Sequence, residues 1–204
     1  MSVQKDYFDR VYSGSEDPFR LRDNWYEERK YAITLASLPR AKYRRALEPG
    51  CSIGVLTEKL SRRCERLIST DVAHAALTTA KARVGSSVRF LEWSLTDDWD
   101  GLCDGQRFDL VVLSEVGYYL SRTDLRAALD TAVVHLEPSA TVLAVHWRHP
   151  VSDYPLTGDE VHAIIGATDG LGRLGGYVDE DMILEVFEAS TNRPESVATI
   201  EGLV

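Results

Sequence analysis

Two acidic residues with clear chemical potential flank a glycine turn near the start of the chain's regular pattern. Glu48 precedes Gly50 and Gly54 in the segment 43–54, YRRALEPGCSIG, and Asp71 closes the next apolar run. A glycine turn lets the backbone approach a ligand closely, and a carboxylate at the end of the next strand can accept both hydroxyls of a ribose. This spacing predicts a site for a nucleoside-bearing cofactor, although the same residues could simply form a tight turn and cap a helix.

The turn favours a cationic cofactor over a dinucleotide. A pyrophosphate site uses G-x-G-x-x-G, whereas Ser52 stands here in place of the middle glycine and Glu48 adds a negative charge nearby. S-adenosylmethionine (SAM) carries a sulfonium and an ammonium but no phosphate, so we expect SAM, with S-adenosylhomocysteine as its product. Asp71 does not distinguish SAM from NAD, because both cofactors contain ribose. A NAD-linked oxidoreductase is therefore the disfavoured alternative.

A second group of candidates follows the predicted strands 108–114 and 141–147, at the edge of the sheet where ligands bind in open α/β folds. His146 is the candidate base or amine-orienting residue, because the pKa of an imidazole lies near neutral. Glu115 is the alternative, as a base or as a partner for an ammonium group. Aromatic and polar side chains that could bind an acceptor are Tyr118, Tyr119, Trp147, Arg148, Asp153 and Tyr154.

Strand and helix patterns alternate from residue 43, which predicts an α/β sheet with helices on both faces. Strands are expected at 44–48, 66–70, 88–93, 108–114, 141–147 and 182–190, helices at 55–64, 74–84, 122–136 and 158–167, and a glycine-rich connection at 170–180.

About forty residues precede this core and show their own helical patterns, at 5–13 and 24–38. Asn24 can cap the second helix and Pro39 ends it. We therefore expect one domain over 1–204, in which residues 1–40 form a helical cover and residues 43–190 form the Rossmann-like core.

Composition narrows the class of partner. With 204 residues and a net charge of -9, the chain disfavours nucleic acid as a substrate. Three cysteines and five histidines show no metal-ligand spacing, so no metal is expected. Without a signal-peptide pattern or a long apolar run, we expect a cytoplasmic protein that does not associate with membranes and is a monomer or homodimer.

On these residues, the chain resembles the class I SAM-dependent methyltransferases. Their first motif, E-x-G-x-G-x-G, appears here as residues 48–54, EPGCSIG, without the middle glycine. The chain is more specifically similar to the nodulation protein S (NodS) group, in the stretches DPF, NWYEERKYAITLASLPRAKYRRALEPGCSIGVLT, FDLVVLSEVGYYL and HWRHPVSDYPLTGDEVH.

The resemblance implies a sheet of seven strands, mostly parallel with an antiparallel last strand, and a SAM pocket. Phe19 would be an aromatic lid, and Arg29 would bind the SAM carboxylate unless it lies on a solvated helix face. The implied cofactor-binding residues are Phe19, Arg29, Glu48, Gly50, Cys51, Ser52, Gly54, Asp71, Val72, Ser94, Leu95, Ser114, Glu115 and Val116.

NodS-type enzymes methylate the free amine of a deacetylated, N-acetylglucosamine-type oligosaccharide, so the resemblance implies an amino sugar or a related small molecule as acceptor. Two alternatives stay open. One is a SAM-dependent N- or O-methyltransferase of another small metabolite in a biosynthetic pathway, and the other is a SAM-binding protein without catalysis.

Overall fold

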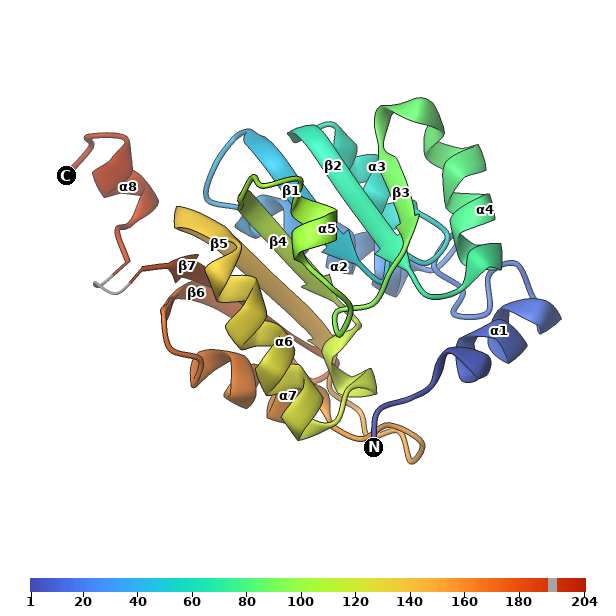
Figure 1. Ribbon diagram of the computed structural model, residues 1–204. Coiled ribbons are helices and arrows are strands. Elements are labelled where there is room, and N and C mark those ends of the chain that lie inside the picture. The colour runs from blue at the N-terminus through green and yellow to red at the C-terminus, as the bar shows by residue number, and fades with distance from the viewer. Residues whose placement is uncertain (191–193) are drawn as a thin grey trace.

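A computed structural model describes residues 1–190 and 194–204 and contains one seven-stranded sheet (Figure 1). The strand order is β3-β2-β1-β4-β5-β7-β6. The strands are β1 Tyr43–Pro49, β2 Cys64–Asp71, β3 Arg89–Glu92, β4 Phe108–Ser114, β5 Leu136–Trp147, β6 Leu171–Val178 and β7 Met182–Ala189.

The parallel strands create one reversal point in this sheet. β1 lies between β2 and β4 and is parallel to both. After β1 the chain adds β2 and then β3 on one side, and returns to the other side of β1 with β4, so the strand order reverses at the boundary between β1 and β4. In open α/β sheets, ligands bind beyond the carboxyl ends of the strands at such a point. β7 is antiparallel to β5 and β6, which confirms the fold expected from the sequence.

Helices cover both faces of the sheet, with α5, α6 and α7 on one face and α2, α3 and α4 on the other (Figure 1). Each face therefore has its own apolar core, as a sheet buried on both sides requires. The helices are α1 Lys5–Gly14, α2 Trp25–Ser37, α3 Val55–Ser61, α4 His74–Val84, α5 Asp100–Cys103, α6 Arg122–Val134, α7 Gly158–Gly166 and α8 Val197–Ile200.

Local signals in the sequence explain where several helices begin. The Asn24 side chain accepts a hydrogen bond from the Tyr26 N–H at the start of α2, and Ser121 does the same for Asp124 at the start of α6. Thr157 and Glu160 form a capping box at α7. No helix in the described part of the chain has the length and apolar content needed to cross a membrane.

The glycine-rich segment predicted as a connection is instead a strand, β6. Glycine weakens a strand because it loses more backbone entropy on folding and has no side chain to pack, and for this reason the glycine-rich sequence did not predict a strand. In β6, however, a Cβ at Gly176 would lie 2.4 Å from the Leu184 carbonyl oxygen of β7. Close approach of the two backbones therefore requires a glycine at this position, beside a register irregularity between Arg173 and Gly175.

Candidate active site

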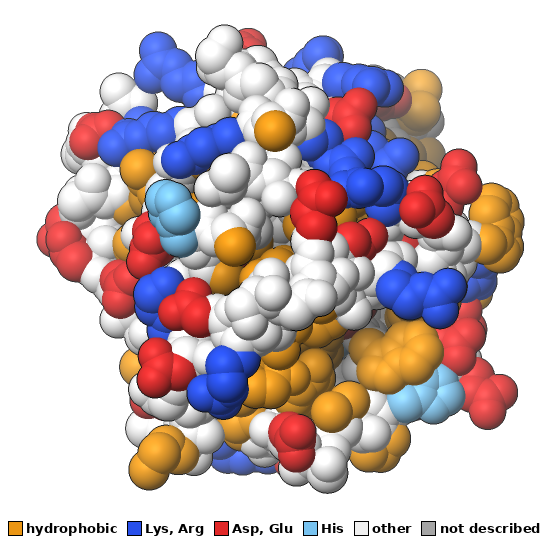
Figure 2. All heavy atoms as spheres, turned by 90° about the vertical axis from the view of Figure 1, so that its right-hand side faces the viewer, with side chains coloured by type: hydrophobic (Ala, Val, Ile, Leu, Met, Phe, Trp, Pro, Cys, Tyr) orange, Lys and Arg blue, Asp and Glu red, His pale blue; other side chains and the backbone are white. Residues whose placement is uncertain are grey.

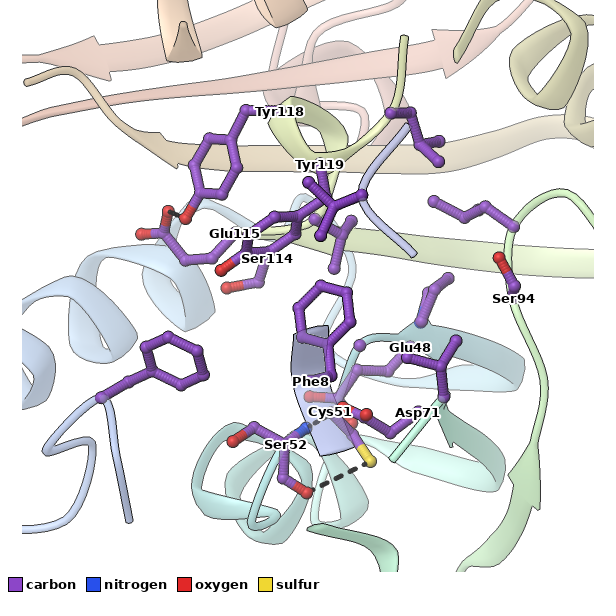
Figure 3. Close-up of a pocket in the computed structure, with 18 of the residues that line it drawn as sticks. Phe8, Glu48, Cys51, Ser52, Asp71, Ser94, Ser114, Glu115, Tyr118 and Tyr119 are labelled. Atoms are coloured by element: carbon purple, nitrogen blue, oxygen red, sulfur yellow. Dashed lines mark hydrogen bonds between the residues drawn. The ribbon is translucent and has the colours of Figure 1, made fainter. Parts of the chain in front are cut away.

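A cavity of about 890 Å³ opens beyond the carboxyl ends of β1, β2, β4 and β5 (Figure 3). Glu48, Ser52 and Asp71 lie on one side, which we call the β1–β3 side, and Glu115 and Tyr118 lie on the other, the β4–β5 side. Seen from the side of α1, apolar side chains gather in a hollow of the surface bordered by charged groups (Figure 2).

The glycine turn brings the backbone close to the loop after β4. Gly50 has φ +70°, and a Cβ built there would lie 2.2 Å from Cγ1 of Val116. Only glycine can adopt this conformation at this distance without moving its neighbour. Gly54 has another role, because it begins α3 with φ +78° and its Cβ position lies 3.0 Å from the Cβ of Ala80 on α4.

Asp71 is held rigidly at the end of β2. One carboxylate oxygen accepts the Ser52 backbone N–H at 2.9 Å and the other accepts the Ala73 N–H at 2.9 Å. Burial raises the pKa of Asp71 above its ordinary value, and these backbone hydrogen bonds oppose the rise. Each oxygen keeps a second lone pair, so the carboxylate can accept two hydroxyls of a ligand.

Glu48 is a second buried carboxyl on the β1–β3 side. One of its oxygens accepts hydrogen bonds from the Thr57 and Ser69 hydroxyls, at 2.6 and 2.7 Å. Burial, together with the charge of Asp71, raises the pKa of Glu48 from an ordinary value near 4.5 to about 7, against the effect of these two hydrogen bonds. A positive ligand in the cavity would favour the ionised form of this group.

The segment after β3 closes the β1–β3 side. Trp93, Ser94 and Leu95 line the cavity, and Trp93 packs edge-on against Trp99 with ring centroids 5.2 Å apart. The Ser94 N–H donates to the Asp97 carboxylate at 2.8 Å. Asp97 also lines the cavity.

The first residues of the chain lie across the cavity, which the sequence did not predict in detail. Val3 donates its N–H to the Tyr119 carbonyl at 2.8 Å, and Phe8 packs edge-on against Tyr119. On the β1–β3 side, Lys5 donates to the Val72 carbonyl at 2.6 Å and Tyr12 shares a 2.5 Å hydrogen bond with Ser52. This segment therefore contacts both sides.

Glu115 organises the β4–β5 side. Its Oε1 accepts from the Lys30 ammonium at 2.7 Å, and its Oε2 accepts from the Tyr118 hydroxyl at 2.7 Å and the Trp147 backbone N–H at 2.9 Å. Its φ of +57° lies in the left-handed region, which is unusual for a residue other than glycine. The strained backbone is held by partners from α2, the turn after β4, and β5.

Lys30 is the functional-site residue that sequence reasoning missed. Only 2% of its side chain is exposed, and its ammonium lies between Glu27, at 2.9 Å, and Glu115. Burial alone would lower the pKa of Lys30, but the two carboxylates outweigh it and the pKa is raised. The i, i+3 spacing of Glu27 and Lys30 in YEERKY was the available signal.

Aromatic rings form much of the wall on the β4–β5 side. Tyr118 stacks on Tyr154 with centroids 5.0 Å apart, and Tyr119 packs against both rings. Trp147 meets Tyr26 edge-on at 5.0 Å. Burial raises the pKa of Tyr118 and Tyr119, so both hydroxyls stay protonated near neutral pH.

Most of the residues expected at the site line this one cavity. They are Phe19, Glu48, Gly50, Cys51, Ser52, Asp71, Val72, Ser94, Leu95, Ser114, Glu115, Val116, Tyr118, Tyr119, Trp147 and Tyr154. Five others lie outside it: Arg29, Gly54, His146, Arg148 and Asp153.

His146 does not have the position that a base requires. It is fully buried, its Nε2 accepts the Gly117 backbone N–H at 3.0 Å, and its Nδ1 is 3.1 Å from Nε2 of His162. Both ring nitrogens are therefore occupied away from the cavity. The pattern placed His146 correctly at the strand end, but in β5 successive side chains alternate between faces, and this one points into the core.

Arg29 turns away from the cavity and does not reach a cofactor there. Its guanidinium forms an ion pair with Asp179 at 2.9 Å and donates to the Tyr177 hydroxyl at 2.5 Å. Arg148 likewise pairs with Asp159, at 3.0 Å, and Asp153 is an exposed loop residue. The acceptor role predicted for these last two does not fit their positions.

The donor set of the β1–β3 side fits SAM. Four carboxyls line it: Glu48, Asp71, Glu92 and Asp97. Glu92 is paired with Lys5 at 3.2 Å, whereas within residues 1–190 and 194–204 no ion pair is found for Glu48 or Asp71. The charge of Asp71, and that of Glu48 in its ionised form, is therefore available to a sulfonium or ammonium group. No group of three His, Cys, Asp or Glu side chains suited to a metal ion was found among the described residues.

The fold and this site define a SAM-dependent methyltransferase of class I. Residues 4–153 match the family described as nodulation protein S (NodS), and the chain belongs to that family. It is 31% identical over 191 residues to nodulation protein S of Sinorhizobium fredii, covering 87% of this chain and 85% of the relative. It is 35% identical over 130 residues to nodulation protein S of Bradyrhizobium diazoefficiens, covering 63% and 61% of the two chains.

Solved structures agree with this assignment. The N-methyltransferase NodS of Bradyrhizobium japonicum WM9, in complex with S-adenosyl-L-homocysteine, superposes with a TM-score of 0.79 at 27% identity, covering 94% of this chain and 98% of that one. A putative methyltransferase from Pseudomonas syringae has a TM-score of 0.67 at 34% identity, covering 81% and 99%. The SAM cofactor predicted from the glycine turn is confirmed.

Proposed function

We propose that this methyltransferase transfers the methyl group of SAM to the amine of a small amino-sugar-type acceptor, bound on the β4–β5 side of the cavity. One observation carries the proposal: two carboxylates, Glu27 and Glu115, face a single cation, Lys30, in this part of the cavity. The unbalanced negative charge favours an acceptor that carries an amine. The relative of known structure is described as an N-methyltransferase, which supports the same atom as acceptor.

The aromatic wall supports a ring-shaped acceptor. Tyr118, Tyr119, Tyr154 and Trp147 all line the cavity, and aromatic rings of this kind can pack against a sugar ring. The Tyr118 hydroxyl donates to Glu115, which leaves its oxygen lone pairs able to accept an N–H or O–H of the acceptor.

In this proposal, the chain works mainly by alignment, because methyl transfer is an in-line displacement. SAM, when bound, supplies an activated methyl group. Gly50, Ser52 and Asp71 would fix the position of the nucleoside and methionine parts, while the N-terminal residues across the cavity would exclude water. Glu115, fixed by three donors, would orient the amine beside the reacting centre.

The proposal does not need a general base from the chain. Glu115 already accepts three hydrogen bonds, and the tyrosines hold their protons. We therefore expect the acceptor amine to react in its neutral form and the extra proton to leave to solvent after transfer. The rate should rise with pH until the amine of the acceptor is neutral, and then level.

The test uses the full chain, labelled SAM, and a glucosamine oligosaccharide with one free amine. The matched control is the same oligosaccharide with that amine acetylated. We expect methyl transfer to the first and none to the second, with the product methylated at nitrogen by mass spectrometry. Equal transfer to both would place the reaction on a hydroxyl and contradict the amine assignment.

A further inference from the structure

A line of buried polar groups runs from the β4–β5 side of the cavity toward the surface. The Gly117 N–H donates to Nε2 of His146 at 3.0 Å, Nδ1 of His146 lies 3.1 Å from Nε2 of His162, and Nδ1 of His162 lies 2.9 Å from Glu185. His146 and His162 are 0% and 3% exposed. Glu185 also receives the partly exposed guanidinium of Arg173 at 2.5 Å.

The donors and acceptors along this line can be arranged in one way when both rings are neutral. The Gly117 N–H can only donate, so Nε2 of His146 must carry a lone pair and Nδ1 must carry the proton. That proton is donated to Nε2 of His162, whose own Nδ1–H then faces the Glu185 carboxylate. Burial, followed by the neighbouring His162 and Lys30, lowers the pKa of His146 well below its ordinary value, which keeps this ring neutral.

The line ends on the turn that carries the aromatic wall. Gly117 begins the short helix η2, Gly117–Tyr119, so the two tyrosines of the wall follow it directly. A Cβ at Gly117 would lie 2.4 Å from Val161 on α7 and 3.1 Å from Nε2 of His146. The turn is therefore pressed against α7 and the imidazole, and the hydrogen bond to His146 fixes where its backbone lies.

We propose that His146 and His162 are positioning residues for the methyl acceptor: through the Gly117 N–H they hold the turn that presents Tyr118 and Tyr119 to the cavity. This inference rests on the proposed function in one respect, namely that the acceptor binds against these two tyrosines. His146, which the sequence predicted to be a base, would then act on the acceptor indirectly: Glu185 and His162 hold its ring, and its ring holds the Gly117 backbone.

Two substitutions at one position separate this role from simple filling of the core. His146→Gln places an amide oxygen near the former Nε2 and can still accept the Gly117 N–H, whereas His146→Asn places its amide near the former Nδ1 and cannot reach Gly117. Both remove an imidazole from the same buried site. Asn is one methylene shorter than Gln, so a role in packing alone predicts a difference in overall stability but no selective change in the acceptor KM and in Gly117 exchange.

We expect His146→Asn to raise the KM for the acceptor about tenfold, and His146→Gln to stay within about threefold of the wild type, because one hydrogen bond is the difference. The dissociation constant of S-adenosylhomocysteine, measured by calorimetry, should change by less than about twofold in both, since the β1–β3 side is untouched. A second readout needs no acceptor: exchange of the Gly117 amide hydrogen, followed by NMR, should be faster in His146→Asn and near the wild-type rate in His146→Gln.

Equal acceptor KM and equal Gly117 exchange in the two variants would overturn the proposal, as would loss of S-adenosylhomocysteine binding in step with acceptor binding. His162→Gln, which keeps an acceptor near the former Nε2, should stay near the wild type in the acceptor KM and in Gly117 exchange. A change in both in this variant would contradict the proposed line of donors and acceptors, and this measurement serves if either His146 variant fails to fold. If the wild type methylates only hydroxyl acceptors, the proposed function fails, while the positioning role is still measured on that acceptor and on Gly117 exchange.

Discussion

The two sides of the cavity are built in different ways. On the β1–β3 side, the Asp71 carboxylate is fixed by backbone N–H groups of Ser52 and Ala73, so most of the geometry follows from one turn and two strand ends. On the β4–β5 side, Glu115 depends on Lys30 of α2, which is 85 residues away, and on Trp147 of β5. The first is a local backbone structure, and the second is a network of side chains from several elements.

The difference has a functional reading. A site made of backbone and glycine suits a ligand that is the same in every member of a class, because few side-chain changes can disturb it. A site made of side chains from separate elements can change with any one of them, which suits the acceptor, the part that differs between methyltransferases. Four predictions test this contrast.

The largest effect is expected from Lys30→Met, which leaves Glu27 and Glu115 as uncompensated charges on the β4–β5 side. Removing one partner of a buried ion pair costs about 3–5 kcal/mol, equivalent to a fall of about 10 °C in Tm for a chain of this size. Differential scanning calorimetry measures this. The exposed Lys81→Met is the matched control and should melt near the wild type. A Lys30→Met protein as stable as Lys81→Met would contradict the buried network.

Gly50→Ala should break the β1–β3 side. The added Cβ meets Val116 Cγ1 at 2.2 Å in a backbone conformation with φ +70°, so the turn must shift. We expect SAM affinity by calorimetry to fall about a hundredfold, equivalent to about 2.7 kcal/mol. Gly166→Ala, at a glycine with no atom within 4 Å of the added Cβ, is the control. Adding Val116→Ala to Gly50→Ala should recover part of the affinity, and no recovery would show that the contact is not the cause.

Asp71→Asn tests the local geometry with a smaller change. The amide NH₂ would face one of the two backbone N–H donors, so one hydrogen bond and the negative charge are lost together. We expect SAM affinity to fall about tenfold, while the acceptor KM stays unchanged. Asp130→Asn on the exposed face of α6 should change neither constant. If the acceptor KM rose together with the dissociation constant of SAM, the β1–β3 and β4–β5 sides of the cavity would be coupled.

The smallest effect is a dependence of SAM affinity on pH through Glu48. Its pKa of about 7 in the folded chain lies above the unfolded value, so its contribution to stability is full below about pH 4.5 and falls as pH rises toward about 7. A cationic ligand favours the ionised form, so SAM affinity should rise a few-fold across this window and then level. Calorimetry near pH 6 in two buffers of different ionisation enthalpy should detect release of a proton. Glu48→Gln should abolish the release, and a release unchanged in this variant would exclude Glu48 as its source.

The same contrast explains what the sequence could predict. Glu48, Gly50 and Asp71 line the cavity, as the sequence predicts, because their geometry depends mostly on one turn and two strand ends. Arg29 and Lys30 are adjacent on α2, and a turn of 100° per residue puts one toward Asp179 and the other into the cavity. Which of the two faces inward depends on how α2 docks on the sheet, and the helical pattern alone does not give this.

His146 shows a second limit of the same kind. The pattern locates it at the end of β5, but the face of the strand on which it lies depends on the packing of α7, which brings His162 to its ring. A titratable residue at the carboxyl end of a strand was therefore a sound indication of the region and a poor indication of the role.

The placement of two tryptophans lets intrinsic fluorescence distinguish the ligands. Trp93 lines the β1–β3 side and Trp147 lines the β4–β5 side, while Trp99 is 2% exposed and Trp25 is 71% exposed. Trp25 and Trp99 would first be replaced by Phe. A variant that keeps only Trp93 would then report binding on the β1–β3 side, where SAM is expected, and a variant that keeps only Trp147 would report binding on the β4–β5 side, where the acceptor is proposed to bind. Arrival and departure of each could then be timed in a stopped-flow instrument, without a label on either molecule.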